Sequence, residues 1–441
     1  MALDREELNK RRQAREEERK KRKRARRLMK LRLAVAVLVL IGCGVGLAMV
    51  IRDTGSPVQS VLATQPEEQE TEPPTEPPTE APPNWEQAPV KISLVAGGDL
   101  NVTDQVVWSG QQGGEFDYTK AFMDVSPILA EADLAFMNFE GNFCGAPYGT
   151  ATVSAPPQML DALKKAGVDM LQVANSCSVT NGMLGLTSTL NTIRSAGIET
   201  LGAYLSEDEF NRTKGYTICT VNDVKIAFVA FTKGVGGLGM PAGSEKCVNI
   251  LYTDYYTNYQ KIDKERITSV LKAAESEKPD LTVALLHWGS EYNDTVYETQ
   301  EDIVYIMQQA GVDVIIGSHP HRVQHVDYDP LTGQLVAYSL GDFFGDGKKD
   351  GTFYSVLLNL EITKDYEAGI TRVTDWNYVP IYTLSETECD GDRRVIRIEN
   401  AIAAYEGNYV EKVTASCYEN LKFALDRIAK RIVPPPAENK S

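Results

Sequence analysis

A set of polar side chains follows the apolar runs of this sequence, at positions where buried strands would end. The set comprises Asp99 in GGDLN, Asn138 and Glu140 in NFEGN, Asn175 in ANSCS, His287 in LLHWG, and His319 and His321 in IIGSHPH. Carboxylate, amide and imidazole groups can hold manganese, zinc or iron and can transfer protons. We therefore predict one polar site that holds a divalent metal. The alternative is that each side chain only satisfies local hydrogen bonds.

The His319-Pro320-His321 element makes a more specific prediction. A proline favours extended backbone in the residue before it, and residues i and i+2 of an extended chain point the same way. We therefore expect both imidazoles to face one pocket. The alternative is that they bond backbone carbonyls in a tight loop, and we expect the nearby His325 to be structural.

The elements that must position these groups are those of an α/β domain, because short apolar runs alternate with amphipathic stretches. We expect strands at Val90–Ala96, Asp133–Asn138, Val168–Ala174, Leu281–Leu286, Val312–Ile316, 353–362 and 371–379. We expect helices at Ala155–Lys165, Gly182–Ser195, Gln260–Ser276, Glu298–Gln309 and within 397–433. Hairpins are expected at 217–231 and 323–340. Ligands of open parallel sheets bind beyond the carboxyl ends of the strands, where the polar set falls.

The first 51 residues predict a membrane anchor. Residues 1–32 carry 15 Lys and Arg against 6 Asp and Glu, a net charge of +9, and residues 33–51 are nineteen residues without a charge. A run of about 20 apolar residues spans a bilayer, and the positive-inside rule places the basic segment in the cytoplasm. A rival interpretation is a lipoprotein cleaved at Leu40-Ile41-Gly42-Cys43, with a lipid on Cys43.

The rest of the chain is acidic, with 30 Lys and Arg against 55 Asp and Glu, which argues against a nucleic-acid partner. The repeat TEPPTEPPTEAPP (71–83) indicates a semi-rigid spacer. No C-x-x-C pair occurs, so the sequence gives no zinc ribbon or thioredoxin motif. We divide the chain into a basic cytoplasmic segment (1–32), a transmembrane signal anchor (33–51), a Pro/Glu-rich linker (52–90), an extracytoplasmic domain (91–383) and a C-terminal helical extension (384–441).

Several of these motifs together resemble those of the CapA family, the poly-γ-glutamate capsule-synthesis proteins related to calcineurin-like metallophosphatases. The motifs are GGDLN (97–101), DLAFMNFEGNF (133–143), ANSCSVTNGMLGLTSTLNTIRSAGI (174–198), LLHWGSEY (285–292), AGVDVIIGSHPHRVQ (310–324) and YSLGDFF (338–344). The resemblance covers about residues 91–383. It implies a four-layer α/β/β/α sandwich of metallophosphatase type, here preceded by one transmembrane helix. It also implies a pocket in which Asp99, Asn138, Asn175, His287, His319 and His321 are metal ligands, with His287 or Glu140 as acid or base.

The sequence departs from the family at three positions. Cys177 stands where the family usually has histidine, Asp342 where it has asparagine, and Asn101 where metallophosphatases have histidine. These departures favour one metal ion or none over a two-metal centre. Cys177 is either a ligand that favours zinc or a space-filling side chain.

The resemblance implies a membrane-anchored, extracytoplasmic protein that assembles, transfers or releases an anionic surface polymer or cell-wall glycan, with a membrane synthase as a partner. Two alternatives remain: a metal-dependent phosphoesterase that acts on cell-wall components, and a non-catalytic scaffold of a polymer synthase complex. The tyrosines of YTDYYTNY (252–259) either stack on glycan or flank a solvated loop.

Overall fold

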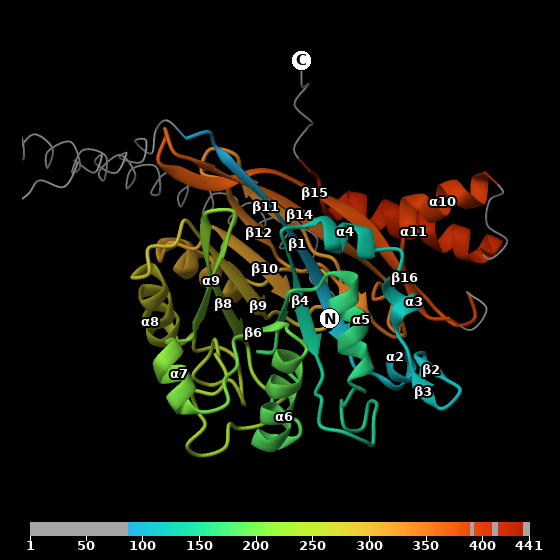
Figure 1. Cartoon of the computed structure of the whole chain (residues 1–441), viewed down its shortest axis with the longest axis horizontal. Coiled ribbons are helices and arrows are strands. Elements are labelled where there is room, and N and C mark those ends of the chain that lie inside the picture. Colours follow the sequence, from blue (N-terminus) through green and yellow to red (C-terminus); the bar gives the residue numbers. More distant parts are fainter. Residues whose placement is uncertain (1–86, 389–391, 408–412, 435–441) are drawn as a thin grey trace, which may run out of the picture. The chain divides into compact units, whose positions relative to one another are not determined.

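The computed structural model describes residues 87–388, 392–407 and 413–434 (Figure 1). The predicted basic segment 1–32 and membrane anchor 33–51 lie outside these residues, as does the predicted linker up to residue 86. Among the helices of the described residues, none combines the length and the hydropathy that a bilayer span requires. All the described residues belong to one unit, Glu80–Ser441.

The first of two large sheets has eight strands in the order β16-β15-β14-β1-β4-β5-β6, and β13 pairs with the end of β1. Its strands are β1 (Val90–Asn101), β4 (Leu134–Glu140), β5 (Met170–Gln172), β6 (Glu199–Leu201), β13 (Asp342–Phe344), β14 (Tyr354–Asp365), β15 (Ile370–Leu384) and β16 (Arg394–Arg397). Strands β1, β4, β5 and β6 run parallel, and β13 is parallel to β1. Their carboxyl ends therefore meet at one edge.

The second sheet has six strands in the order β11-β12-β10-β9-β8-β7. Its strands are β7 (Tyr216–Val221), β8 (Val224–Thr232), β9 (Leu281–His287), β10 (Val314–Ser318), β11 (Val326–Asp329) and β12 (Gln334–Ala337), and a separate ribbon pairs β2 (Gln111–Gln112) with β3 (Glu115–Phe116). Strands β8, β9 and β10 run parallel, so this sheet also gathers carboxyl ends at one edge.

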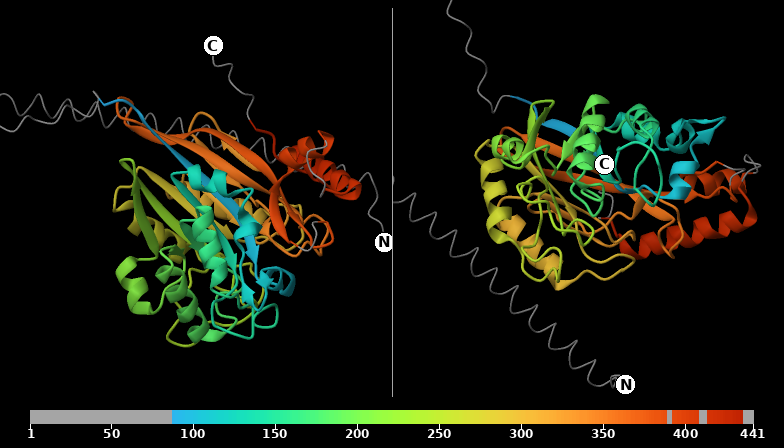
Figure 2. Two further views of the ribbon diagram at one scale, coloured as in Figure 1. Left: turned by 45° about the vertical axis from the view of Figure 1, so that its right-hand side comes forward. Right: turned by 90° about the horizontal axis from the view of Figure 1, so that it is seen from below.

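Helices cover the outer face of each sheet. The helices are α2 (Asp104–Trp108), α3 (Thr119–Phe122), α4 (Ser126–Glu131), α5 (Gln158–Ala166), α6 (Gly182–Ser195), α7 (Glu207–Thr213), α8 (Lys264–Glu275), α9 (Glu298–Gln309), α10 (Ile398–Glu406) and α11 (Ala415–Arg431). Buried side chains of α3, α4, α5 and α6 share one apolar core with the first sheet, and those of α8 and α9 share another with the second. Figure 2 shows these two sets of helices on opposite sides of the strands.

A third apolar core lies between the two sheets. Phe136 of β4 contacts Phe228 of β8 across it, with ring centroids 5.5 Å apart. Helix α11 contributes Leu421 and Ile428 to the same core, because its apolar residues repeat at helical spacing. The layers are therefore helix, sheet, sheet and helix, a mixed α/β fold as the sequence predicts.

The structure confirms most of the predicted elements. The helices predicted at Gly182–Ser195 and Glu298–Gln309 are α6 and α9 with the same bounds, and both hairpins are present as β7-β8 and β11-β12. Helix α8 begins at Lys264 rather than at Gln260, because the Asp263 side chain accepts a bond from Arg266 N and caps the helix there. The strand predicted at Val168–Ala174 is shorter, Met170–Gln172.

Candidate functional site

The candidate site lies where the carboxyl ends of the two sheets meet. In the first sheet, Asp99 stands opposite Asn138, and Asn101 stands opposite Glu140. In the second sheet, His287 ends β9, and the next loop after β10 carries the other two buried histidines. All seven predicted site residues are buried, and hydrogen bonds or close contacts connect them.

A close backbone approach brings one more acidic residue to this edge. A Cβ atom on Gly98 would lie 1.8 Å from the carbonyl oxygen of Gly341, so only glycine fits there. The next residue, Asp99, donates its backbone N–H to that same oxygen at 2.9 Å and stands opposite Asp342 of β13. The glycine contact thus sets the carboxylate of Asp342 beside that of Asp99.

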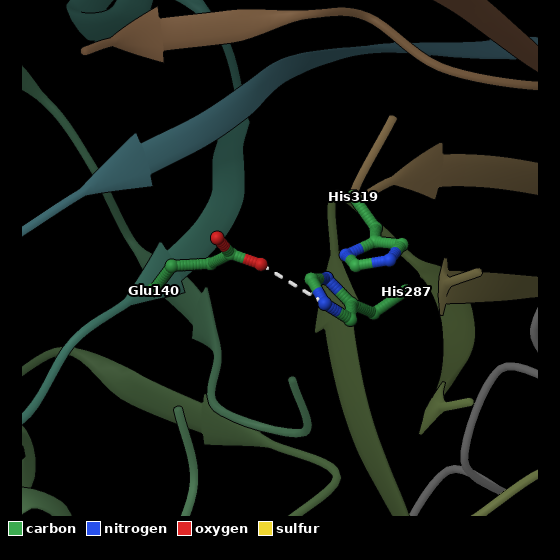
Figure 3. A group of neighbouring side chains, drawn as sticks. All are labelled: Glu140, His287 and His319. Carbon is green, nitrogen blue, oxygen red and sulfur yellow. Dashed lines mark ion pairs between the residues drawn. The ribbon is translucent and has the colours of Figure 1, made fainter. Parts of the chain in front are cut away.

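Glu140, His287 and His319 form the first group of candidate metal ligands (Figure 3). Glu140 Oε1 lies 2.9 Å from His287 Nε2, and the two imidazole centroids are 4.4 Å apart. One ligand atom from each side chain lies within 4.8 Å of the other two. A single divalent ion could contact all three, since carboxylate oxygen and imidazole nitrogen suit zinc, manganese and iron.

The Nε2 atom of His287 has more neighbours than one imidazole nitrogen can serve. Besides the Glu140 carboxylate, it lies 3.2 Å from the backbone N–H of Ser176 and 3.0 Å from the Ser176 hydroxyl. A neutral imidazole nitrogen either donates one hydrogen bond or accepts one. When Nε2 accepts a bond from Ser176, its lone pair and the negatively charged Glu140 oxygen repel each other. A proton or a metal ion between the two atoms would remove this repulsion.

Asp99, His321 and Asp342 form the second group of candidate ligands. His321 Nδ1 lies 2.8 Å from Asp342 Oδ1 and 3.7 Å from Asp99 Oδ2. The other ring nitrogen of His321 lies 3.7 Å from Glu140 Oε2, which links the two groups. A third set, Glu291, His319 and His321, shares one histidine with each of these groups. The described residues therefore offer three overlapping donor sets, where the sequence predicted one metal ion or none.

Two asparagines link the Asp99 carboxylate to the backbone of β4. Asn138 donates from Nδ2 to Asp99 Oδ1 at 2.6 Å, and Asn175 donates to Asn138 Oδ1 at 3.1 Å. Asn175 also donates to the carbonyl oxygen of Phe139 at 2.6 Å. These bonds orient Asp99, and they occupy the side-chain oxygen of Asn138, a predicted metal ligand.

The backbone prediction for the His-Pro-His element is wrong. His319 has φ 91° and His321 has φ 55°, so neither residue is extended. Positive φ is strained for a histidine and persists where surrounding contacts hold it. Here His319 N–H donates to Asp99 Oδ2 at 3.0 Å, and His321 is held by Asp342. Both rings still reach the same cluster, as predicted, but for a different reason.

The pKa values of two buried carboxyl groups, Asp99 and Glu140, shift in opposite directions. Burial and the nearby Glu140 carboxylate raise the pKa of Asp99 to about 8. Burial also opposes ionisation of Glu140, but His287 and His321 outweigh it, and the pKa of Glu140 is lowered. Glu140 is therefore the ionised member of the cluster, while Asp99 retains a proton more readily.

The three histidines differ in the same way. Burial lowers the pKa of His287, and it lowers that of His319 well below the ordinary value. Burial would also lower the pKa of His321, but Asp342 and the other carboxylates outweigh it and raise that pKa well above the ordinary value. His287 and His319 thus present neutral nitrogens, the form that binds metals, and His321 is protonated without one.

A cavity of about 420 Å³ adjoins the first group. Six of the residues that line it are Ser176, Lys233, Gly236, Tyr259, Glu291 and His319. Of the YTDYYTNY tyrosines, Tyr259 borders this cavity, whereas Tyr252 is buried in the core beneath the second sheet's helices. The geometry therefore combines a metal-ligand cluster with space for a substrate beside it.

The comparisons with known proteins agree with the motifs. The sequence model described as "Bacterial capsule synthesis protein PGA_cap" matches residues 93–347, more than half of the chain. The chain belongs to this family. The matched region contains every residue of both candidate ligand groups.

Two curated proteins of Bacillus are similar to this chain. The chain is 28% identical over 267 residues to "Capsule biosynthesis protein CapA" of Bacillus anthracis, covering 58% of this chain and 61% of that protein. It is 26% identical over 250 residues to "PGA biosynthesis protein CapA" of Bacillus subtilis, covering 55% of this chain and 61% of that protein. The match thus spans about three fifths of each relative's length.

Solved structures similar to this chain include two phosphatase-related proteins. A phosphatase from Mycoplasma pneumoniae has a TM-score of 0.41 and 14% identity, covering 66% of this chain and 94% of its own. The calcineurin-like phosphoesterase YfkN from Bacillus subtilis has a TM-score of 0.40 and 14% identity, covering 78% of this chain and 98% of its own.

The described side chains fit a divalent metal ion. His319 Nδ1 is buried and has no hydrogen-bond partner among the described residues. A buried imidazole nitrogen without a partner is costly unless it binds something, and this one belongs to a set that also offers a carboxylate and a neutral imidazole. Both sets consist of oxygen and nitrogen donors, which suit manganese, zinc and iron.

Cys177 does not belong to any ligand group found among the described residues. Burial, followed by the Glu140 carboxylate, raises the pKa of its thiol well above the ordinary value. Because only a thiolate binds metal well, this environment agrees with the space-filling alternative. Its backbone N–H donates to Asn175 Oδ1 at 2.9 Å, which helps to hold that asparagine.

Three residues of the site were missed from the sequence. Asp342 was noted only as a departure from the family, yet it pairs with His321. Glu291 lies in the LLHWGSEY motif four residues after His287, and Lys233 directly follows the apolar run that forms β8. The rule that found the other residues, a polar side chain just after an apolar run, would also have selected Lys233.

Proposed function

We propose that this chain acts outside the cell in the assembly, transfer or release of an anionic surface polymer of the poly-γ-glutamate type, assisted by a divalent metal. The observation that carries the proposal is the pair of adjoining ligand groups beside a substrate-sized cavity. Membership of the capsule-synthesis family supports the choice of polymer.

The residues of the cluster suit acyl chemistry on such a polymer. A metal held by Glu140, His287 and His319 would supply a Lewis acid that polarises an acyl or phosphoryl oxygen. Glu140 is ionised and His287 is neutral, which are the protonation states in which these two side chains would hold the metal. Asn138 and Asn175 keep Asp99 oriented throughout.

Replacing Glu140 by glutamine in cells should abolish surface-polymer production. Glutamine retains the size and a hydrogen-bonding group near His287 but removes the anion that would hold the metal. The control is Glu131→Gln, at the exposed end of α4, which should leave polymer levels unchanged. Polymer is measured immunochemically on cells that contain equal amounts of each variant.

Two other outcomes would replace this proposal. Normal polymer on cells with Glu140→Gln would favour the non-catalytic scaffold. Chelator-sensitive hydrolysis of bis(p-nitrophenyl) phosphate by the purified full chain, without any effect of the variant on polymer, would favour a phosphoesterase of cell-wall components.

We further propose that the chain is anchored by residues 33–51 with its amino terminus in the cytoplasm, beside a membrane synthase. The uncharged run and the +9 segment before it support this orientation. Protease added to intact protoplasts should remove the acidic domain by cleavage within 53–90 and spare residues 1–32. Protection of the domain would reverse the orientation, and a diacylated Cys43 at the amino terminus, seen by mass spectrometry, would replace the anchor with a lipoprotein.

A further inference from the structure

The cavity beside the ligand groups is lined by a cationic side chain, Lys233, although carboxylates are numerous in the site. Lys233 follows the last residue of β8, and its backbone N–H donates to the carbonyl oxygen of His287 at 2.7 Å. Its ammonium group donates to the Gly289 carbonyl oxygen at 2.7 Å and lies 4.5 Å from the ring centroid of Tyr259. Among the described residues it has no carboxylate within ion-pair distance, so it can bind an anion from outside the chain.

A glycine turn keeps the space next to Lys233 open. Val235 and Leu238 bridge across Gly236 and Gly237, whose φ angles are 68° and 75°. A Cβ atom on Gly236 would lie 2.8 Å from the carbonyl oxygen of Ser176, whereas one on Gly237 would meet nothing within 4 Å. The turn therefore passes close to the site without a side chain filling the cavity.

The same cavity is lined by an anion. Glu291 is exposed, and its carboxylate lies within 4.8 Å of ligand atoms of His319 and His321. The cavity wall thus offers one ammonium group, one carboxylate and the unpartnered Nδ1 of the buried His319. A ligand that carries both an anion and a cation on neighbouring atoms matches this wall better than a plain polyanion does.

We propose that this cavity binds the amino-terminal residue of a γ-linked glutamate chain, with the α-carboxylate on Lys233 and the α-ammonium on Glu291. This inference rests on the proposed function and specifies its substrate. In a γ-linked chain the terminal residue carries both free groups on one carbon, whereas internal residues carry only the carboxylate. An α-linked peptide has no free α-carboxylate at its amino end.

The arrangement also explains how an acidic domain accepts a polyanion. The residues after 32 carry a net charge of −25, which disfavours approach of a negative polymer. One chain end that presents a positive group to Glu291 avoids part of that repulsion. At about 420 Å³, the cavity falls in the size range of small-molecule sites and holds an end residue rather than a length of chain.

The test is calorimetric binding of γ-linked diglutamate to the full-length protein in the presence of a chelator. Lys233→Met should weaken binding roughly 10- to 100-fold, the scale of a lost charge-assisted hydrogen bond. Lys225→Met is the matched control, since Lys225 lies at the other end of β8 and pairs with Glu277. It should leave the affinity unchanged, because it removes the same charge at a residue that is not among those lining the cavity.

Acetylation of the ligand's α-amino group tests the second proposed contact, the one between the α-ammonium group and Glu291. N-acetylated γ-diglutamate and α-linked diglutamate should both bind more weakly to the wild type, and Glu291→Gln should remove the preference for the free amine. Equal affinity of the Lys233→Met and Lys225→Met variants, or equal binding of the acetylated probe, would overturn the inference. Tighter binding of a phosphodiester probe would overturn it as well.

The subsite and the proposed function can be refuted separately. Loss of polymer in Glu140→Gln cells, together with no binding of diglutamate, would refute the subsite alone. Diglutamate binding through Lys233, with normal polymer in Glu140→Gln cells, would refute the proposed function and leave the subsite.

Discussion

Cells that carry His319→Asn should produce no surface polymer, while the protein melts close to the wild-type temperature. His319 Nδ1 is buried without a partner among the described residues, so removing the ring breaks no hydrogen bond of that nitrogen. Asparagine tolerates the positive φ of 91° better than most residues, and its backbone N–H can still donate to Asp99. The loss therefore falls on metal and substrate binding. Polymer immunoassay and thermal unfolding measure the two effects.

The matched control is the same substitution at His321, which also has positive φ. There the ring pairs with Asp342 at 2.8 Å in a buried position, and removing it leaves carboxylates without their cation. Breaking such a buried pair costs roughly 3–5 kcal/mol, so His321→Asn should lower the melting temperature clearly. The sequence gives the two histidines the same predicted role. In the structure, His321 stabilises the fold through its ion pair, whereas His319 is available to bind a ligand. Equal melting temperatures for the two variants, or polymer on His319→Asn cells, would contradict this assignment.

The sequence predicted the helices and strands that form the layers, because each of these elements has a local periodicity of apolar residues. The helix at Gly182–Ser195 buries Leu186, Leu190 and Ile193, which recur at helical spacing and belong to the core of the first sheet. The strand ending at His287 is buried along its whole length and mostly apolar, as expected for a strand whose two faces are both covered. Because parallel strands share one carboxyl edge, polar residues after such runs could be brought together without knowing the strand order.

The second ligand group could not be predicted in this way. Asp342 reaches Asp99 because β13 pairs in parallel beside the end of β1, a contact between segments more than 200 residues apart that Gly98 makes possible. The local pattern of YSLGDFF does not predict that this strand pairs with β1. The backbone of His319 was also mispredicted, because the proline preference was outweighed by the bond from its N–H to Asp99.

Replacing Asp342 by asparagine should weaken metal binding by the second ligand group about 10- to 100-fold, the range seen when supporting residues of metal sites are changed. Asparagine keeps the shape and an oxygen near His321 but removes one of three carboxylates that crowd this end of the cluster. Asparagine has nearly the same size and shape as aspartate, so folding should be preserved. Calorimetric titration of the metal-free full chain with manganese and with zinc measures the change.

The pH dependence of the metal affinity tests whether Asp342 acts on Asp99. A metal ion must displace protons from its ligands, and Asp99 has a pKa raised to about 8 by burial, by Glu140 and, in part, by Asp342. Wild-type affinity should therefore rise with pH up to at least about 8, because His321, whose pKa is also raised well above its ordinary value, must lose its proton too. In Asp342→Asn one negative neighbour is gone, the pKa of Asp99 falls, and the affinity should level off at a lower pH. Asp350→Asn, at an exposed carboxylate that pairs with Arg322, should leave both the affinity and the profile unchanged. Identical profiles for the wild type and Asp342→Asn would show that Asp342 only orients His321 and that the second group binds no metal.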